Sequence, residues 1–135
     1  DYSLTNVMVG KDDPNVIAIL DWELSTLGDP CADFNYHCLQ YTMNPKLADK
    51  DYCVSKGIPI IEDYVQMYSE KIEIDLTEEW DLYSAYNLFK LAGILQGILG
   101  RVRDGTAANQ NAAERASGVK NLSDTAWDLV QKNFL

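Results

Sequence analysis

The most apolar stretch of this chain, residues 82–99, lies in a predicted helix over residues 78–103 and constrains the fold more than any other segment. Apolar side chains occur at positions all around a helix of this length, and such a helix must be covered by protein. Asn87, Lys90 and Gln96 interrupt the stretch, so it does not predict a membrane span. We therefore expect this segment to be the buried centre of a mostly helical unit.

From about residue 30 onward, residues typical of helix caps and turns predict where further helices begin and end. Asp29 followed by Pro30 is typical of a helix N-cap and first turn. Thr77 is a candidate cap for the central helix, and Gly105 ends it. Residues 44–56 are polar and mixed, which favours a loop or short helical turns. The predicted helices span residues 31–41, 61–72, 78–103 and 112–132.

The first twenty residues have a different pattern. Two β-branched apolar runs, residues 7–9 and 16–20, flank a turn-rich segment from Gly10 to Asn15. This order predicts an antiparallel hairpin with a six-residue loop. A hairpin followed by about four helices is an α+β arrangement, mostly helical.

The charge of the chain limits its partners. Its 135 residues carry a formal net charge of −10, with 21 Asp and Glu against 11 Lys and Arg. Because a carboxylate-rich surface repels phosphate groups, we expect neither a nucleic acid nor an anionic membrane as partner.

The three cysteines predict free thiols. Cys31 and Cys38 are two helical turns apart in a predicted helix, which is too far for a disulfide. Buried free thiols are typical of a reducing intracellular compartment, which is the cytoplasm in a bacterium and could be mitochondrial or peroxisomal in a eukaryote.

Two polar residues at the ends of the hairpin are candidate ligands. If Val9 pairs with Val16, Asn6 lies opposite Ile19 and Asp21 is its diagonal neighbour on the same face. Amide and carboxylate oxygens are ligands that suit Mg²⁺ together with water and substrate phosphates. The spacing alone favours ordinary turn residues over a metal site, because short polar patterns recur by chance.

Three sequence blocks follow one another at the start of the chain. The first is Asp1-Tyr2-Ser3-Leu4-Thr5-Asn6, a D-x-x-x-x-N pattern; the second, residues 17–23, is an apolar run ending in Asp21-Trp22-Glu23; and the third covers residues 24–33. In this order they resemble the catalytic loop, the metal-binding strand and the segment after it in the aminoglycoside phosphotransferase and choline kinase-like family.

Residues 20–30, 57–59 and 92–101 are similar to a narrower group, the phosphotransferase domain found fused to acyl-CoA dehydrogenases. The resemblance implies the C-terminal lobe of a protein-kinase-like fold, with residues 1–23 as catalytic loop and metal-binding hairpin and residues 24–135 as a helical subdomain. The 135 residues contain no Gly-rich loop and no phosphate-pairing strand Lys. We therefore expect the N-terminal nucleotide-binding lobe to be missing from them.

The resemblance also implies roles for individual residues. Asp1 would accept the proton of the substrate hydroxyl, and Asn6 and Asp21 would hold Mg²⁺ bridging the phosphates of ATP. Glu23 would bind a second metal ion or support the first, although a solvated surface Glu is an equally open reading. Asp33 would support the catalytic loop structurally, through backbone hydrogen bonds.

The implied activity is transfer of the γ-phosphate of ATP to a hydroxyl of a small molecule, such as a hydroxyacyl-CoA, beside a fused or partner acyl-CoA dehydrogenase domain. The 135 residues alone are expected to be inactive. The alternative is a non-catalytic helical interaction module.

Two other features have structural interpretations. One face of the central helix carries three glycines, Gly93, Gly97 and Gly100, and this pattern predicts close packing against another helix. A zinc site at His37 is not predicted, because no further ligands follow it at zinc spacing.

Overall fold

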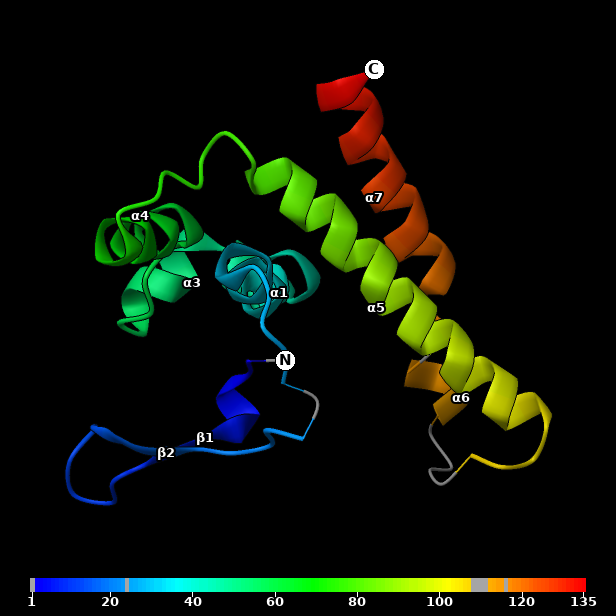
Figure 1. Cartoon of the computed structure of the whole chain (residues 1–135), viewed down its shortest axis with the longest axis horizontal. Helices are drawn as coiled ribbons and strands as arrows, with labels where there is room; N and C mark the ends of the chain where they lie inside the picture. Colours follow the sequence, from blue (N-terminus) through cyan, green and yellow to red (C-terminus); the bar gives the residue numbers. More distant parts are fainter. Residues whose placement is uncertain (1, 24, 108–111, 116) are drawn as a thin grey trace. The chain divides into compact units, whose positions relative to one another are not determined.

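The computed structural model describes residues 2–23, 25–107, 112–115 and 117–135. The chain forms two compact units, residues 1–61 and 62–135 (Figure 1). Within the described residues, no helix is long and apolar enough to cross a membrane.

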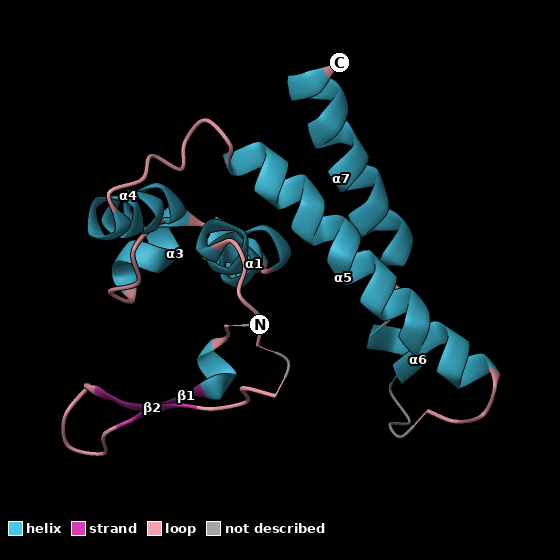
Figure 2. Ribbon diagram, viewed as in Figure 1, coloured by secondary structure: helices cyan, strands magenta, loops and turns pink. Residues whose placement is uncertain are grey.

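The order of elements is a two-stranded hairpin followed by helices (Figure 2). It confirms the mostly helical α+β class and is consistent with a kinase-like C-terminal lobe. Among the described helices, α1, α4, α5 and α7 have twelve residues or more and the other three are short. The elements are the 3-10 helix η1 (Leu4–Asn6), strands β1 (Val7–Val9) and β2 (Val16–Ile19), and helices α1 (Pro30–Met43), α2 (Pro45–Ala48), α3 (Lys50–Ser55), α4 (Ile61–Ile72), α5 (Trp80–Arg103), α6 (Ala112–Arg115) and α7 (Val119–Phe134).

The hairpin has the predicted pairing at its loop end and a different one at its base. Val9 lies opposite Val16, as predicted, and the register then shifts at a β-bulge. The prediction that Asn6 faces Ile19 is wrong for this reason. The Asn6 carbonyl instead accepts a hydrogen bond from the backbone N–H of Leu20, at 2.8 Å.

The starts of two helices show where the cap predictions hold and where they fail. The Asp29 carboxylate accepts a hydrogen bond from the backbone N–H of Cys31 at 2.8 Å, so it caps α1 as predicted. Thr77 does not cap α5. Its backbone N–H and hydroxyl both donate to the Asp75 carboxylate, and α5 begins only at Trp80.

Helix α5 is buried along part of its surface, which corrects the prediction of a helix covered all round. Leu88 and Ala92 are buried, whereas Leu82 is 47% and Phe89 is 44% exposed. Helices α5 and α7 pack side by side (Figure 1). Helix α7, together with the short helix α6, covers only part of the α5 surface, so apolar side chains of α5 outside that part remain exposed.

A hydrogen bond fixes the direction of this helix pair. The side-chain amide of Asn133 donates to the Asp81 carboxylate at 2.8 Å. Asn133 lies in the last turn of α7 and Asp81 in the first turn of α5, so the two helices are antiparallel.

Two further helix predictions are corrected. Gly93 and Gly100 are not sites of close packing, because a β-carbon at either would meet no described atom within 4 Å. The predicted helix over residues 112–132 is two helices, α6 and α7, with Gly118 at the N-cap of α7. Glycine costs about 1 kcal/mol relative to Ala inside a helix, so helix ends near it are expected.

The buried side chains of the first unit come largely from α1 and α3. They include the three cysteines Cys31, Cys38 and Cys53, which are free thiols as predicted. Burial raises the pKa of the Cys38 thiol to about 12, so this group stays protonated and unreactive at neutral pH.

Candidate functional site

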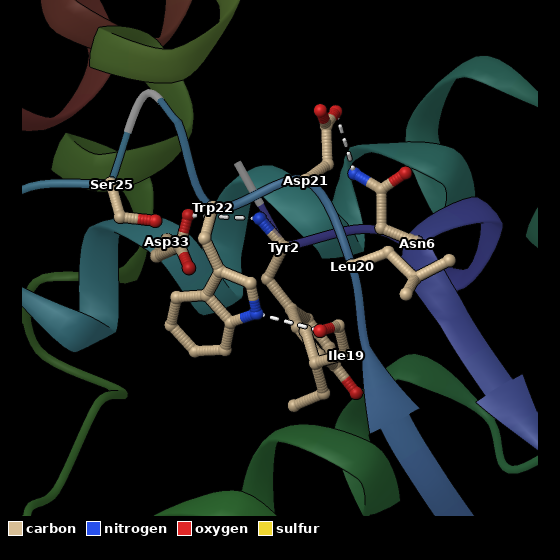
Figure 3. A pocket seen from close by; sticks show the side chains of 8 residues that line it. All are labelled: Tyr2, Asn6, Ile19, Leu20, Asp21, Trp22, Ser25 and Asp33. Carbon is tan, nitrogen blue, oxygen red and sulfur yellow. Dashed lines mark hydrogen bonds between the residues drawn. The ribbon is translucent and has the colours of Figure 1, made fainter.

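A small pocket lies in the first unit, where the base of the hairpin approaches α1 (Figure 3). Its cavity volume is about 110 Å³. Sites for whole drug-sized ligands usually measure roughly 300–1,000 Å³, so this pocket is smaller than a site for a ligand of that size. The lining residues are Tyr2, Asn6, Ile19, Leu20, Asp21, Trp22, Ser25 and Asp33.

The structure brings Asn6 and Asp21 together at one rim of the pocket. The Asn6 side-chain amide donates to the Asp21 carboxylate at 3.3 Å, which is the upper dashed line in Figure 3. Asn6 is the last residue of η1, and Asp21 follows the end of β2 by two positions. The backbone hydrogen bond from Leu20 to Asn6 joins the same two segments one residue earlier. The β-bulge therefore changes the strand register from the predicted one, but Asn6 and Asp21 are still in contact.

The oxygens at this rim suit a magnesium ion. Asp21 Oδ1 and the Asn6 amide oxygen accept no hydrogen bond from any residue within the described ranges. Turning the Asn6 amide by about half a turn exchanges its nitrogen and oxygen, which presents the oxygen on the side of Asp21. One carboxylate and one amide leave room for the waters and phosphate oxygens that Mg²⁺ prefers to keep.

The rest of the described chain offers no competing metal cluster. No three His, Cys, Asp or Glu side chains gather as a metal site among the residues that the structure describes. Glu23 is exposed and is not among the residues that line the pocket. The two readings of Glu23 therefore stay predictions, and Asp1 lies outside the described residues.

Asp33 holds the start of the chain onto α1. Its carboxylate accepts a hydrogen bond from the backbone N–H of Tyr2 at 3.3 Å. Tyr2 directly follows Asp1, so this contact has the form that the resemblance implies for Asp33. The supporting role itself stays a prediction.

Sequence reasoning misses the aromatic partner of this contact. The Tyr2 and His37 rings lie 5.4 Å apart and are tilted by 58°. Burial lowers the pKa of His37, and the nearby Asp33 charge partly opposes that shift. Position 2 lies inside the D-x-x-x-x-N block, but no residue pattern there points to a ring contact with α1.

Sequence reasoning also misses Trp22 and the backbone around Asp21. Asp21 has φ +68°, in the left-handed region. The Trp22 indole N–H donates to the Ile19 carbonyl at 2.6 Å, the lower dashed line in Figure 3. The backbone N–H of Ser25 donates to the Trp22 carbonyl at 2.9 Å, which closes the turn after the site.

Comparison with known proteins adds the family context. The family model described as "Phosphotransferase enzyme family" matches residues 1–86, a span that contains every lining residue of the pocket. No solved structure matches the chain.

Curated relatives match almost the whole chain. Acyl-CoA dehydrogenase family member 10 of Mus musculus is 36% identical over 98% of this chain and 13% of its own length. Acyl-CoA dehydrogenase family member 11 of Homo sapiens is 31% identical over 99% of this chain and 18% of its length. The probable acyl-CoA dehydrogenase IBR3 of Arabidopsis thaliana is 33% identical over 97% of this chain and 16% of its length. The chain thus spans less than a fifth of these relatives.

Proposed function

Because this chain belongs to the phosphotransferase enzyme family, we propose that it is the C-terminal lobe of an ATP- and Mg²⁺-dependent kinase of small molecules. The observation that carries the proposal is the Asn6–Asp21 pair, which joins an amide and a carboxylate at 3.3 Å on the rim of a pocket. Both residues lie in the matched span; Asn6 directly precedes β1 and Asp21 follows the end of β2 by two positions.

In the proposed reaction, the substrate hydroxyl oxygen forms a bond to the γ-phosphorus of ATP while the bond from that phosphorus to the leaving ADP oxygen breaks. The hydroxyl proton passes to the Asp1 carboxylate. Asn6 and Asp21 would hold Mg²⁺, which when bound offsets the negative charge of the phosphates. The chain's own contribution is positioning, and Asp33 contributes to it through the backbone N–H of Tyr2.

The nucleotide base and sugar need walls that this pocket does not provide. A volume of about 110 Å³ accommodates phosphate groups rather than a whole nucleotide. We assign the remaining walls to an N-terminal lobe outside the 135 residues, and the lack of a Gly-rich loop and strand Lys within them supports this division. The 135 residues alone are then inactive.

The names of the relatives suggest the class of acceptor. Acyl-CoA dehydrogenases act on acyl-CoA thioesters, so a hydroxyl on an acyl chain or acyl-CoA is the proposed acceptor, with a fused or partner dehydrogenase domain nearby. Three buried free thiols support a reducing compartment as the place of action, cytoplasmic in a bacterium and mitochondrial or peroxisomal in a eukaryote.

The test is a kinase assay on the full-length protein. ADP release is measured with a panel of hydroxyacyl-CoA, hydroxy-acid and amino-alcohol acceptors, and ³¹P NMR identifies a phosphate monoester in the product. Asp1→Asn and Asp21→Asn should each lower kcat by at least about 100-fold, because they remove the proposed base and a proposed Mg²⁺ ligand.

The matched control is Asp12→Asn, which makes the same charge change on an exposed residue of the hairpin loop outside the pocket. It should leave kcat unchanged. Undiminished turnover in Asp1→Asn would exclude Asp1 as the base. Absence of phosphoryl transfer with every acceptor, combined with retained binding of a protein partner, would favour the helical interaction module instead.

A further inference from the structure

Asp21 is held in a backbone conformation that most residues avoid. Among the described residues other than glycine, only Asp21 and Glu73 have positive φ, at +68° and +57°. For an L-residue this region costs roughly 1–2 kcal/mol, and Asp is among the residues that tolerate it best. The surrounding contacts must therefore hold Asp21 there if its carboxylate is to stay beside Asn6.

Contacts bracket Asp21 on both sides along the chain. On the N-terminal side, the Leu20 backbone N–H donates to the Asn6 carbonyl at 2.8 Å. On the C-terminal side, the Trp22 indole N–H reaches back to the Ile19 carbonyl at 2.6 Å. The indole thus closes a loop around the peptide units of Leu20 and Asp21, as Figure 3 shows.

Packing does not account for the position of Trp22. Its side chain is 64% exposed, so it gains little from burial of apolar surface. Among the described residues, the hydrogen bond that the Trp22 side chain makes is the short one from its indole N–H to the Ile19 carbonyl. The Trp22 N–H bonds a backbone carbonyl two residues before the strained Asp21, so the tryptophan is placed to fix the backbone of that residue.

We propose that Trp22 is a positioning residue: its indole N–H, bonded to the Ile19 carbonyl, keeps Asp21 in the left-handed conformation that directs its carboxylate to Asn6, and thereby sets the affinity of this rim for a divalent cation. The inference rests on the proposed function, in which Asn6 and Asp21 bind the cation. Trp22 itself contacts neither the cation nor the transferred phosphate.

The experiment compares Trp22→Phe with wild type in the full-length protein. Phe keeps an aromatic ring but removes the N–H donor. Binding of Mn²⁺, used as the probe for the Mg²⁺ site, is measured by the EPR signal of the free ion, and the Mg²⁺ dependence of turnover is measured in parallel. We expect about three- to tenfold weaker Mn²⁺ binding and an equal rise in the Mg²⁺ activation constant, as loss of one hydrogen bond predicts.

The matched control is Trp127→Phe, which removes an indole of similar exposure from α7, in the second unit. It should change neither quantity. Saturating Mg²⁺ should restore most of the turnover of Trp22→Phe, which distinguishes a positioning role from general loss of structure.

The outcomes separate the two proposals. If Asp21→Asn abolishes Mn²⁺ binding but Trp22→Phe binds as wild type does, the inference about Trp22 is wrong and the proposed function stands. If Asp21→Asn binds Mn²⁺ as tightly as wild type, the proposed cation site itself is wrong. If Trp22→Phe and Trp127→Phe weaken binding equally, the effect does not arise from the Ile19 hydrogen bond, and the inference is again overturned.

Discussion

The phenol ring of Tyr2 lies against the imidazole of His37, with ring centroids 5.4 Å apart. Tyr2 also donates its backbone N–H to Asp33, one helical turn before His37 on α1. Two independent contacts therefore fix the residue that follows Asp1 onto the same helix. The position next to the proposed base depends on α1 as well as on the hairpin.

The first prediction concerns the titration of His37. Burial lowers its pKa, with Asp33 partly opposing, so the midpoint should lie below the usual 6.5. His37 is the single histidine of the 135 residues, so its ring proton can be followed by NMR without overlap. Asp33→Asn should lower the midpoint further, because it removes the opposing charge. A midpoint above 6.5, or a rise on Asp33→Asn, would contradict this assignment.

The same shift predicts how stability depends on pH. Because the folded pKa is below the unfolded one, the unfolded state binds more protons between the two values. The free energy of unfolding should therefore be fully retained above pH 6.5 and should fall on acidification through that window. His37→Gln should flatten this part of the profile, which thermal unfolding at a series of pH values measures against wild type.

The second prediction uses charge at the pocket rim. Asn6→Asp places two carboxylates where an amide now donates at 3.3 Å, and their repulsion should destabilise the folded protein by about 1 kcal/mol. A divalent cation should reverse that loss, so Mg²⁺ should raise the melting temperature of Asn6→Asp more than that of wild type.

Asn15→Asp is the matched control for this prediction. Asn15 donates its side-chain amide to Asp13 at 2.6 Å in the hairpin loop, outside the pocket. Its substitution should also destabilise, but Mg²⁺ should raise its melting temperature less than it raises that of Asn6→Asp. If Mg²⁺ raises the two melting temperatures equally, the rim formed by Asn6 has no special affinity for the cation.

The third prediction compares two glycines under the same substitution. Gly93 lies exposed inside α5 with open space at its β-carbon position, so Gly93→Ala should stabilise by about 0.5–1 kcal/mol. Gly105 ends the same helix with φ +71°, where a β-carbon is strained, so Gly105→Ala should destabilise by about 1–2 kcal/mol. Denaturant unfolding of both variants measures the difference. A loss of stability in Gly93→Ala would show that this face of α5 is covered after all.

The fourth prediction tests the one-sided burial of α5. Leu88 is 1% exposed and Leu82 is 47% exposed on the same helix. Leu88→Ala should lower the free energy of unfolding by about 2–5 kcal/mol, because it leaves a cavity. Leu82→Ala, the matched control, should cost well under 1 kcal/mol. Equal losses would mean that both faces of α5 contribute to a core.

Much of the secondary structure is predictable because local signals coincide with it. The Asp29–Pro30 pair marks the start of α1, and the apolar periodicity of residues 61–72 matches α4 at both ends. The β-bulge is not predictable in this way, since alternation of side chains does not reveal one unpaired residue in a strand. Thr77 is mispredicted for another reason: its hydroxyl bonds to the nearby Asp75 carboxylate instead of capping α5, and a cap pattern does not show which local partner is chosen.

The candidate site is predictable where side-chain chemistry carries it. Asn6, Asp21 and Asp33 stand out through the resemblance to a family, and all three line the pocket. The roles of Tyr2 and Trp22 are not predictable from the sequence, because their hydrogen bonds at the site involve backbone groups. One offers its main-chain N–H, and the other bonds a main-chain carbonyl. No composition or spacing rule encodes contacts of that kind.

The left-handed backbone conformation of Asp21 means that stability and the proposed function favour different residues at position 21. Glycine has no β-carbon and adopts φ +68° freely, so Asp21→Gly relieves the strain at this site. A directed-evolution screen that rewards heat resistance alone would favour that change. Under the proposed function, an activity screen would discard it, since the carboxylate facing Asn6 disappears with the side chain. Libraries designed to stabilise this protein should therefore hold position 21 fixed.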